Sequence, residues 1–201
     1  MFKDYNVQAD AVEKIEKNFH TLNRHFSMLT AETGAGKTYV AARLAKNFTD
    51  KQKTVLVIAP KTIAKKWERV LTEGGVNMGL VSIYALPETG MTGFEQFKDQ
   101  FFDLILWDEM HTAYDRAHML DMLDTNPKKT YLLGITATSI NKSVDEVFDV
   151  LNYLDFKKLF QHDLFNTTQE DKMRVPFLNL VFKYGFTIGF TKEDVLKEEG
   201  Y

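Results

Sequence analysis

The feature that most constrains this chain is the segment 26–38, in which a short apolar run leads into a loop with two glycines. Phe26–Ala31 has the length and composition of a buried β-strand. Ala31 is followed by four residues and then by Gly36-Lys37-Thr38, which fits the broader [AG]-x-x-x-x-G-K-[ST] pattern. The segment therefore predicts a strand, a phosphate-binding loop and a helix that begins near Thr38.

The chemistry of phosphate binding explains these residue types. Gly34 and Gly36 let successive backbone N–H groups turn toward phosphate oxygens without a Cβ in the way. Lys37 is expected to reach the β- and γ-phosphates, and the Thr38 hydroxyl to bind Mg²⁺ at the N-terminus of a helix. The residues expected to contact a nucleotide are Thr33, Gly34, Ala35, Gly36, Lys37 and Thr38. The alternative is an ordinary strand-turn-helix corner, so a second motif is needed.

A second motif follows the apolar run Phe102–Trp107, which delivers Asp108 and Glu109 at its end. An ATPase needs such acids to hold the metal and to orient or deprotonate the attacking water. We expect Asp108 on the Mg²⁺ side and Glu109 as the group that acts on water, on a strand beside the strand of the phosphate loop. An acidic pair at a strand end can also be a helix N-cap, but together the two motifs predict an ATP and Mg²⁺ site.

His111 comes two residues after the acidic pair and is a weaker prediction. A histidine at a helix start is commonly a surface or capping residue. In this position it could instead relay the state of the γ-phosphate to Thr136 and Thr138, at the end of the next predicted strand.

Apolar strands alternate with amphipathic helices along most of the chain, which predicts an α/β fold with a mostly parallel sheet covered on both faces. The predicted strands are Phe26–Ala31, Thr54–Ala59, Leu80–Leu86, Phe102–Trp107 and Thr130–Thr136. The predicted helices are Val7–Phe19, Thr38–Phe48, Thr62–Leu71, a short one at Phe94–Phe101, Ala117–Leu123 and Val144–Leu154.

The composition changes near residue 161, where a polar stretch runs to Met173. We therefore expect one lobe over residues 1–160 and a C-terminal extension, or the start of a second part, over 161–201. Within the extension, 178–183 and 186–190 have the pattern of a β-hairpin. Thr191 and Asp194 resemble a capping box for a final helix that stops at Gly200.

The totals limit the function classes. The chain has 201 residues, 44% of them hydrophobic, and no cysteine, which excludes disulfides, thiolate metal sites and a cysteine nucleophile. We find no export signal or membrane-spanning run, so a cytoplasmic protein, or a nuclear one in a eukaryote, is the expectation. A net charge of −3 gives no general attraction to nucleic acid, so any such surface has to be local.

Four motifs together resemble the first RecA-like lobe of a superfamily 2 helicase or translocase over about residues 5 to 160. Asp108-Glu109-Met110-His111 is similar to the D-E-x-H box, and residues 31–38 to the first motif. Thr136-Ala137-Thr138 is similar to the motif that couples nucleotide state to nucleic acid. Gln8 matches the glutamine that this superfamily uses to read adenine.

Two further segments resemble the Swi/Snf-like branch. Residues 59–67, Ala-Pro-Lys-Thr-Ile-Ala-Lys-Lys-Trp, are similar to its P-K-S-L-x-x-x-W segment, and 136–160 to the run that follows its third motif. Two departures are Ser139, where a proline is expected, and Ala137, which favours the broader helicase pattern.

The resemblance implies a three-layer P-loop NTPase that binds ATP and Mg²⁺ and contacts a nucleic-acid backbone, with DNA favoured over RNA and no membrane partner. The contacts would come from Lys61, Thr62, Lys65 and Lys66. On charge alone a solvated helix face is the favoured interpretation of this stripe, and the family resemblance reverses that preference. A second RecA-like lobe and its arginine fingers are missing from these 201 residues, so hydrolysis by one lobe is expected to be weak.

Two other functions stay open. One is a nucleotide-gated binding module that recognises a partner and hydrolyses little. The other is the ATPase part of a terminase-like packaging machine, which also has a phosphate loop, an acidic pair and a coupling segment. Gln8 and the 61–67 segment favour the helicase interpretation over the terminase one.

Overall fold

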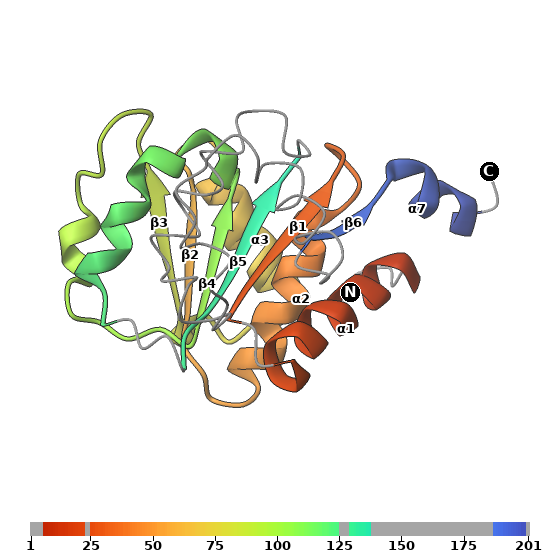
Figure 1. Cartoon of the computed structure of the whole chain (residues 1–201), viewed down its shortest axis with the longest axis horizontal. Coiled ribbons are helices and arrows are strands. Elements are labelled where there is room, and N and C mark those ends of the chain that lie inside the picture. The colour runs from red at the N-terminus through yellow and green to blue at the C-terminus, as the bar shows by residue number, and fades with distance from the viewer. Residues whose placement is uncertain (1–5, 23–24, 125–128, 138–186, 200–201) are drawn as a thin grey trace, which may run out of the picture.

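In the computed structural model, the described residues are 6–22, 25–124, 129–137 and 187–199. They form a six-stranded sheet in which every pairing is parallel, in the order β3-β2-β4-β5-β1-β6 (Figure 1). The strands are β1 (Phe26–Ala31), β2 (Val55–Pro60), β3 (Val81–Leu86), β4 (Leu104–Asp108), β5 (Tyr131–Thr136) and β6 (Thr187–Phe190). The predicted α/β class and parallel sheet are confirmed.

The helices of the described part follow the predicted alternation with small shifts at their ends. They are α1 (Asn6–Glu16), α2 (Lys37–Thr49), α3 (Ala64–Glu73) and α7 (Lys192–Glu199), with a π-helical turn η1 (Lys17–Thr21) continuing α1. The segments predicted as helices at 94–101 and 117–123 are 3₁₀ turns, namely η3 (Phe94–Phe97) and η5 (Tyr114–Met122). Two further 3₁₀ turns, η2 (Met78–Leu80) before β3 and η4 (Met110–Thr112) after β4, were not predicted. The predicted helix 144–154 lies outside the described residues.

Apolar side chains form one core on each face of the sheet. Helices α1, α2 and α3 cover one face, and the 3₁₀ turns η3, η4 and η5 cover the other (Figure 1). Along β4, Leu104 and Leu106 belong to the helical side, whereas Ile105 and Trp107 belong to the opposite side. Because side chains alternate along a strand, Asp108 is on the same face as α3.

The strand that carries the acidic pair is not a direct neighbour of the strand that carries the phosphate loop. β5 lies between them and pairs with both, with Gly134 opposite Met28 of β1 and opposite Trp107 of β4. The expectation that β4 and β1 are adjacent is therefore wrong. The physical consequence is that Thr136, the last residue of β5, lies between the two motifs.

The C-terminal strand joins the main sheet. β6 pairs in parallel with β1, with Ile188 opposite Leu29. The second arm of the predicted hairpin is thus an edge strand beside the phosphate-loop strand, while its first arm, 178–183, lies outside the described residues. The boundary between 160 and 161 also lies outside them and remains a prediction.

The predicted capping of the last helix is present. The Asp194 carboxylate accepts hydrogen bonds from the Thr191 backbone N–H (2.8 Å) and hydroxyl (2.7 Å), and the Thr191 hydroxyl accepts one from the Asp194 N–H (3.1 Å). α7 then ends at Glu199, one residue before Gly200.

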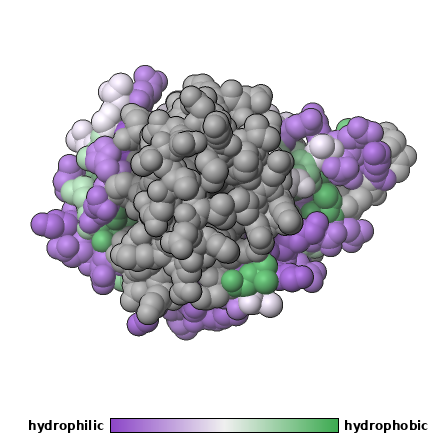
Figure 2. Space-filling model, in the orientation of Figure 1, coloured by the Kyte–Doolittle hydropathy of each residue, from purple (hydrophilic) through white to green (hydrophobic). Residues whose placement is uncertain are grey.

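The outer rim of the described part is mostly hydrophilic, including the end of the molecule at which α7 lies (Figure 2). The large hydrophobic side chains that are exposed among the described residues are Leu22, Tyr39 and Leu196. They are isolated positions of a kind that ordinary protein surfaces carry. Among the described helices, none has the length and apolar character needed to cross a membrane.

Candidate nucleotide-binding site

The loop between β1 and α2 has the backbone conformation that its glycines predict. Gly34 and Gly36 have φ values of +86° and +98°, a region that other residues rarely adopt. The Gly36 carbonyl oxygen accepts hydrogen bonds from the Tyr39 and Val40 N–H groups, which begins α2. A Cβ on Gly36 would collide with the Gln8 side-chain amide. The backbone conformation therefore favours glycine at this position, and a Cβ would also have to displace the Gln8 amide.

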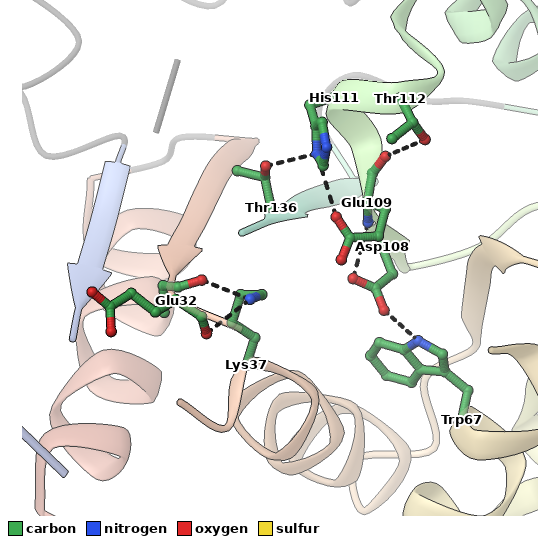
Figure 3. A network of polar contacts seen from close by, with 9 residues as sticks. Glu32, Lys37, Trp67, Asp108, Glu109, His111, Thr112 and Thr136 are labelled. Carbon is green, nitrogen blue, oxygen red and sulfur yellow. Dashed lines mark hydrogen bonds and ion pairs between the residues drawn. The ribbon is translucent and has the colours of Figure 1, made fainter. Parts of the chain in front are cut away.

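Lys37 projects into the loop from the first position of α2. Its ammonium donates hydrogen bonds to the carbonyl oxygens of Ala31 (2.6 Å) and Glu32 (3.2 Å), while the Glu32 carboxylate points away (Figure 3). Burial lowers the pKa of Lys37, and the charges of Glu109 and Asp108 oppose that shift. A desolvated cation whose hydrogen bonds go to carbonyl oxygens is suited to an anionic ligand such as a phosphate.

Gln8 connects α1 to the same loop. Its side-chain amide is buried and donates a 3.1 Å hydrogen bond to the Ala35 carbonyl oxygen. The sequence places these residues 27 positions apart, so the contact fixes the loop from outside its own strand-turn-helix unit. Its predicted role in reading adenine remains a prediction.

Asp108 ends β4 and is 5% exposed. One carboxylate oxygen accepts a 2.7 Å hydrogen bond from the Trp67 indole N–H, and the other accepts a 2.9 Å bond from the Glu109 backbone N–H. Burial raises the pKa of Asp108, and these two hydrogen bonds and the charge of Lys37 oppose the rise. The carboxylate is therefore held in one orientation (Figure 3).

Glu109 follows with a left-handed backbone, φ +50°, which is uncommon for a residue with a Cβ. Burial and the neighbouring Asp108 carboxylate both raise the pKa of Glu109. Its carboxylate oxygen lies 3.4 Å from His111 Nδ1. Strained backbone and a raised carboxylate pKa are both typical of a residue that handles a proton.

His111 also contacts the end of β5. Its Nδ1 lies 2.8 Å from Thr136 Oγ1, so His111 contacts one of the two threonines to which it is predicted to relay the state of the γ-phosphate. The relay itself remains a prediction. Met110 is fully buried, and a Cβ on Gly134 would approach its sulfur to 2.6 Å. The missing side chain at Gly134 thus lets η4 pack closely on β5. Thr138 lies outside the described residues.

The donor set fits a Mg²⁺ ion that is shared with phosphates. Asp108 supplies a carboxylate, and Thr38, at the start of α2, supplies a hydroxyl. The described residues contain no group of three or more His, Cys, Asp or Glu side chains arranged to hold a metal. Mg²⁺ usually takes one or two carboxylates together with phosphate oxygens and waters, so an all-protein cage is not needed.

The predicted nucleic-acid residues lie on the segment between β2 and α3 and on the first turn of α3. Lys61 and Thr62 precede the helix, and the side chains of Lys65 and Lys66 on α3 are exposed. Lys66 also lies close enough for its charge to influence the pKa values of Lys37, Asp108 and Glu109. This segment therefore borders the candidate site.

Sequence reasoning missed how Trp67 and Gly134 take part in the site. Trp67 was noted only as the last residue of the 59–67 segment, and Gly134 was not singled out. No local pattern indicates either contact, since Trp67 is 41 residues from Asp108 and Gly134 is far along the chain from Met110. The indole N–H of a buried tryptophan usually has an acceptor, which is the one signal that could have prompted a search.

The family whose model matches this sequence is described as type III restriction enzyme, res subunit, over residues 1–80. A comparison with curated proteins gave no match. Among solved structures, the chain is similar to the Sulfolobus solfataricus SWI2/SNF2 ATPase core in complex with dsDNA, with a TM-score of 0.64 and 17% identity. It is also similar to the large terminase of a thermophilic bacteriophage, with a TM-score of 0.57 and 8% identity.

These alignments cover 94% and 97% of this chain, but only 45% and 47% of the two known ones. The chain thus spans about half the length of the structures it matches. The chain therefore shares the fold of these two ATPases, and the match of residues 1–80 to the restriction-enzyme family model agrees with the predicted resemblance to the first RecA-like lobe of a superfamily 2 enzyme.

Proposed function

We propose that this chain is the ATP-binding lobe of an ATP-dependent nucleic-acid helicase or translocase, in which ATP hydrolysis is coupled to nucleic-acid binding. The observation that carries the proposal is the convergence of two motifs on one edge of the sheet. Lys37 is electrostatically coupled to both Asp108 and Glu109, although the acids lie far along the chain from it. In parallel sheets, ligands bind at the carboxyl ends of the strands, where these three residues lie.

The chain's own residues divide the chemistry. The loop amides and Lys37 would bind and orient the phosphates, while Asp108 and Thr38 would hold the metal. When bound, Mg²⁺ neutralises charge on the phosphates. Glu109, with its raised pKa, accepts a proton from the water, and His111 connects Glu109 to Thr136 at the end of β5.

Calorimetry with Mg·ATP tests the nucleotide site. We expect saturable binding by the natural chain and its loss in Lys37→Ala. Lys46→Ala is the matched control, because Lys46 lies on the same helix and pairs with Asp50 on the surface. Absence of heat from the natural chain, or unchanged binding by Lys37→Ala, would refute the ATP site.

DNA is the favoured nucleic-acid partner, because one of the similar structures is an ATPase core in complex with dsDNA. Lys61 and Lys65 would contact phosphates, which gives binding without sequence preference. We expect Lys61→Ala/Lys65→Ala to reduce the slope of log affinity against log salt by about two, one for each lost contact. Glu68→Ala on the same helix is the control, and an unchanged slope in the lysine variant contradicts this interface.

A second candidate is a nucleotide-gated binding module with little hydrolysis. It is favoured by the charges around the site. No arginine is among the described groups that shift the pKa values of Lys37, Asp108 or Glu109. An arginine finger contributes about 10³ to 10⁵ in rate where it has been dissected.

ATPase assays with DNA, with RNA and without polynucleotide separate these candidates. Stimulation by DNA that is lost in Glu109→Gln supports the motor lobe. Tight Mg·ATP binding with no turnover under any of the three conditions supports the binding module. The terminase-like interpretation shares the fold, but Gln8, which bonds to the phosphate loop from α1, and the 61–67 segment favour the helicase interpretation.

A further inference from the structure

The two tryptophans of this chain are equally buried, but they differ in the hydrogen bonding of their indole N–H groups. Trp67 on α3 and Trp107 on β4 are both fully buried, and they lie on opposite faces of the sheet. The Trp67 indole N–H donates to Asp108, whereas the Trp107 indole N–H has no hydrogen-bond partner in the part of the chain that the structure describes. Of the two indoles, Trp67 is thus the one connected to the candidate site.

The Trp67 contact fixes the orientation of a buried acid. Each Asp108 oxygen has one donor, the indole N–H at 2.7 Å for Oδ2 and the Glu109 backbone N–H at 2.9 Å for Oδ1. The backbone donor belongs to the next residue of the chain. Trp67 is therefore the donor that ties the carboxylate to a separate element, α3 (Figure 3).

α3 is itself anchored around Trp67. The Trp67 backbone N–H donates to the Ile63 carbonyl oxygen, and Val70 and Leu71 are buried on the same side of the helix. The exposed residues Lys65 and Lys66 precede Trp67 directly. A side chain packed in this way has little freedom to turn its N–H away from Asp108.

We propose that Trp67 is a positioning residue for the metal site: its indole N–H holds the Asp108 carboxylate in the orientation that binds Mg²⁺ with the nucleotide. This inference rests on the proposed function, because it assumes a nucleotide-bound metal at Asp108. Partners that orient a metal ligand commonly change metal affinity by about 10- to 100-fold when they are removed.

The test compares Trp67→Phe with Trp107→Phe. Both substitutions replace a fully buried indole by a phenyl ring, but only the first removes a donor to Asp108. The probe is ADP, titrated by calorimetry at a series of Mg²⁺ concentrations. We expect Trp67→Phe to raise the Mg²⁺ concentration for half-maximal ADP binding by about tenfold or more. ADP affinity without Mg²⁺ is expected to change equally in the two variants.

A double-mutant cycle separates positioning from a general packing defect. If Trp67 acts through Asp108, Trp67→Phe causes no further loss of Mg²⁺ dependence in an Asp108→Asn background. An equal loss in both backgrounds overturns the proposal, as does an equal Mg²⁺ shift in the two tryptophan variants. A natural chain that binds no ADP at any Mg²⁺ concentration refutes the proposed function instead.

The Trp107→Phe chain also works as a reporter, since Trp67 is then its single tryptophan. We expect its emission to change on addition of Mg·ADP, with Asp108→Asn abolishing the change. This measurement keeps the proposal testable if Trp67→Phe does not fold. Emission that responds equally with and without the Asp108 carboxylate contradicts it.

Discussion

The phosphate loop and the acidic edge after β4 form the two halves of the candidate site, and they are held in different ways. The loop is determined mainly by its own backbone, with glycines at φ +86° and +98° and a lysine that bonds carbonyls five and six residues away. The acidic edge depends on side chains from elsewhere: Trp67 for Asp108, and Thr136 for His111. The backbone of the phosphate loop thus supplies most of the loop's geometry, whereas the side chains of the acidic edge are oriented by residues from other parts of the fold.

The substitution with the largest expected effect is Glu109→Gln, which tests whether the acidic edge serves hydrolysis while the phosphate loop serves nucleotide binding. Glu109→Gln keeps the shape but removes the group that we propose accepts the proton. We expect turnover to fall by about 10²- to 10⁴-fold, the usual contribution of a general base, while Mg·ADP binding stays within about twofold. Single-turnover ATPase assays and calorimetry measure the two quantities. Equal losses of Mg·ADP affinity and of turnover would mean that the acidic edge contributes to nucleotide binding as well as to hydrolysis.

Gly36→Ala tests whether the geometry of the phosphate loop depends on the Gln8 contact as well as on the loop's own backbone. The new Cβ is strained by the φ of +98° and collides with the Gln8 amide, so we expect nucleotide affinity to drop by about 100-fold, or about 2.7 kcal/mol. Gly93→Ala is the control, because Gly93 has a φ of +87° but open space around it. Similar ADP affinity in the two variants would show that the close approach of Gln8 does not matter.

Gly134→Ala tests whether the acidic edge depends on its neighbours. The Cβ would press on the Met110 sulfur behind the acidic pair, and overpacking of this kind costs about 1–3 kcal/mol of unfolding free energy. We expect a lower Cm in urea and reduced turnover. The second substitution Met110→Ala makes room for the Cβ and is expected to recover part of the turnover. No recovery would place the defect elsewhere in β5.

Thr136→Val has the smallest expected effect. It preserves shape while removing the hydroxyl that contacts His111, a hydrogen bond worth about 0.5–1.5 kcal/mol, so polynucleotide-stimulated ATPase should fall by up to about tenfold. Thr130→Val is the control on the same segment, since the buried Thr130 hydroxyl has no hydrogen-bond partner among the described residues. The prediction fails if both variants lose the same activity.

Most of the sheet could be predicted from the sequence, because buried parallel strands are continuous apolar runs. The predicted strand 26–31 has the same bounds in the structure, and the other four differ by one or two residues at their ends. The 3₁₀ turns η3 and η5 were predicted as helices, since short apolar periods do not distinguish the two. The parallel pairing of β6 with β1 was not predicted, because a short strand next to a turn signal also fits a hairpin.

The sequence by itself determined which residues make up the candidate site: a glycine loop with the phosphate-binding pattern at 31–38, an acidic pair at 108–109, and a histidine and a threonine that meet in the structure. Only the tertiary structure decided the strand order, with β5 between the two motifs, and the donor that holds Asp108. The physical reason is the distance along the chain over which each kind of interaction acts. Backbone conformation and residue type act over a few positions, whereas the indole of Trp67 reaches Asp108 only after the parallel strands and the helices between them have packed.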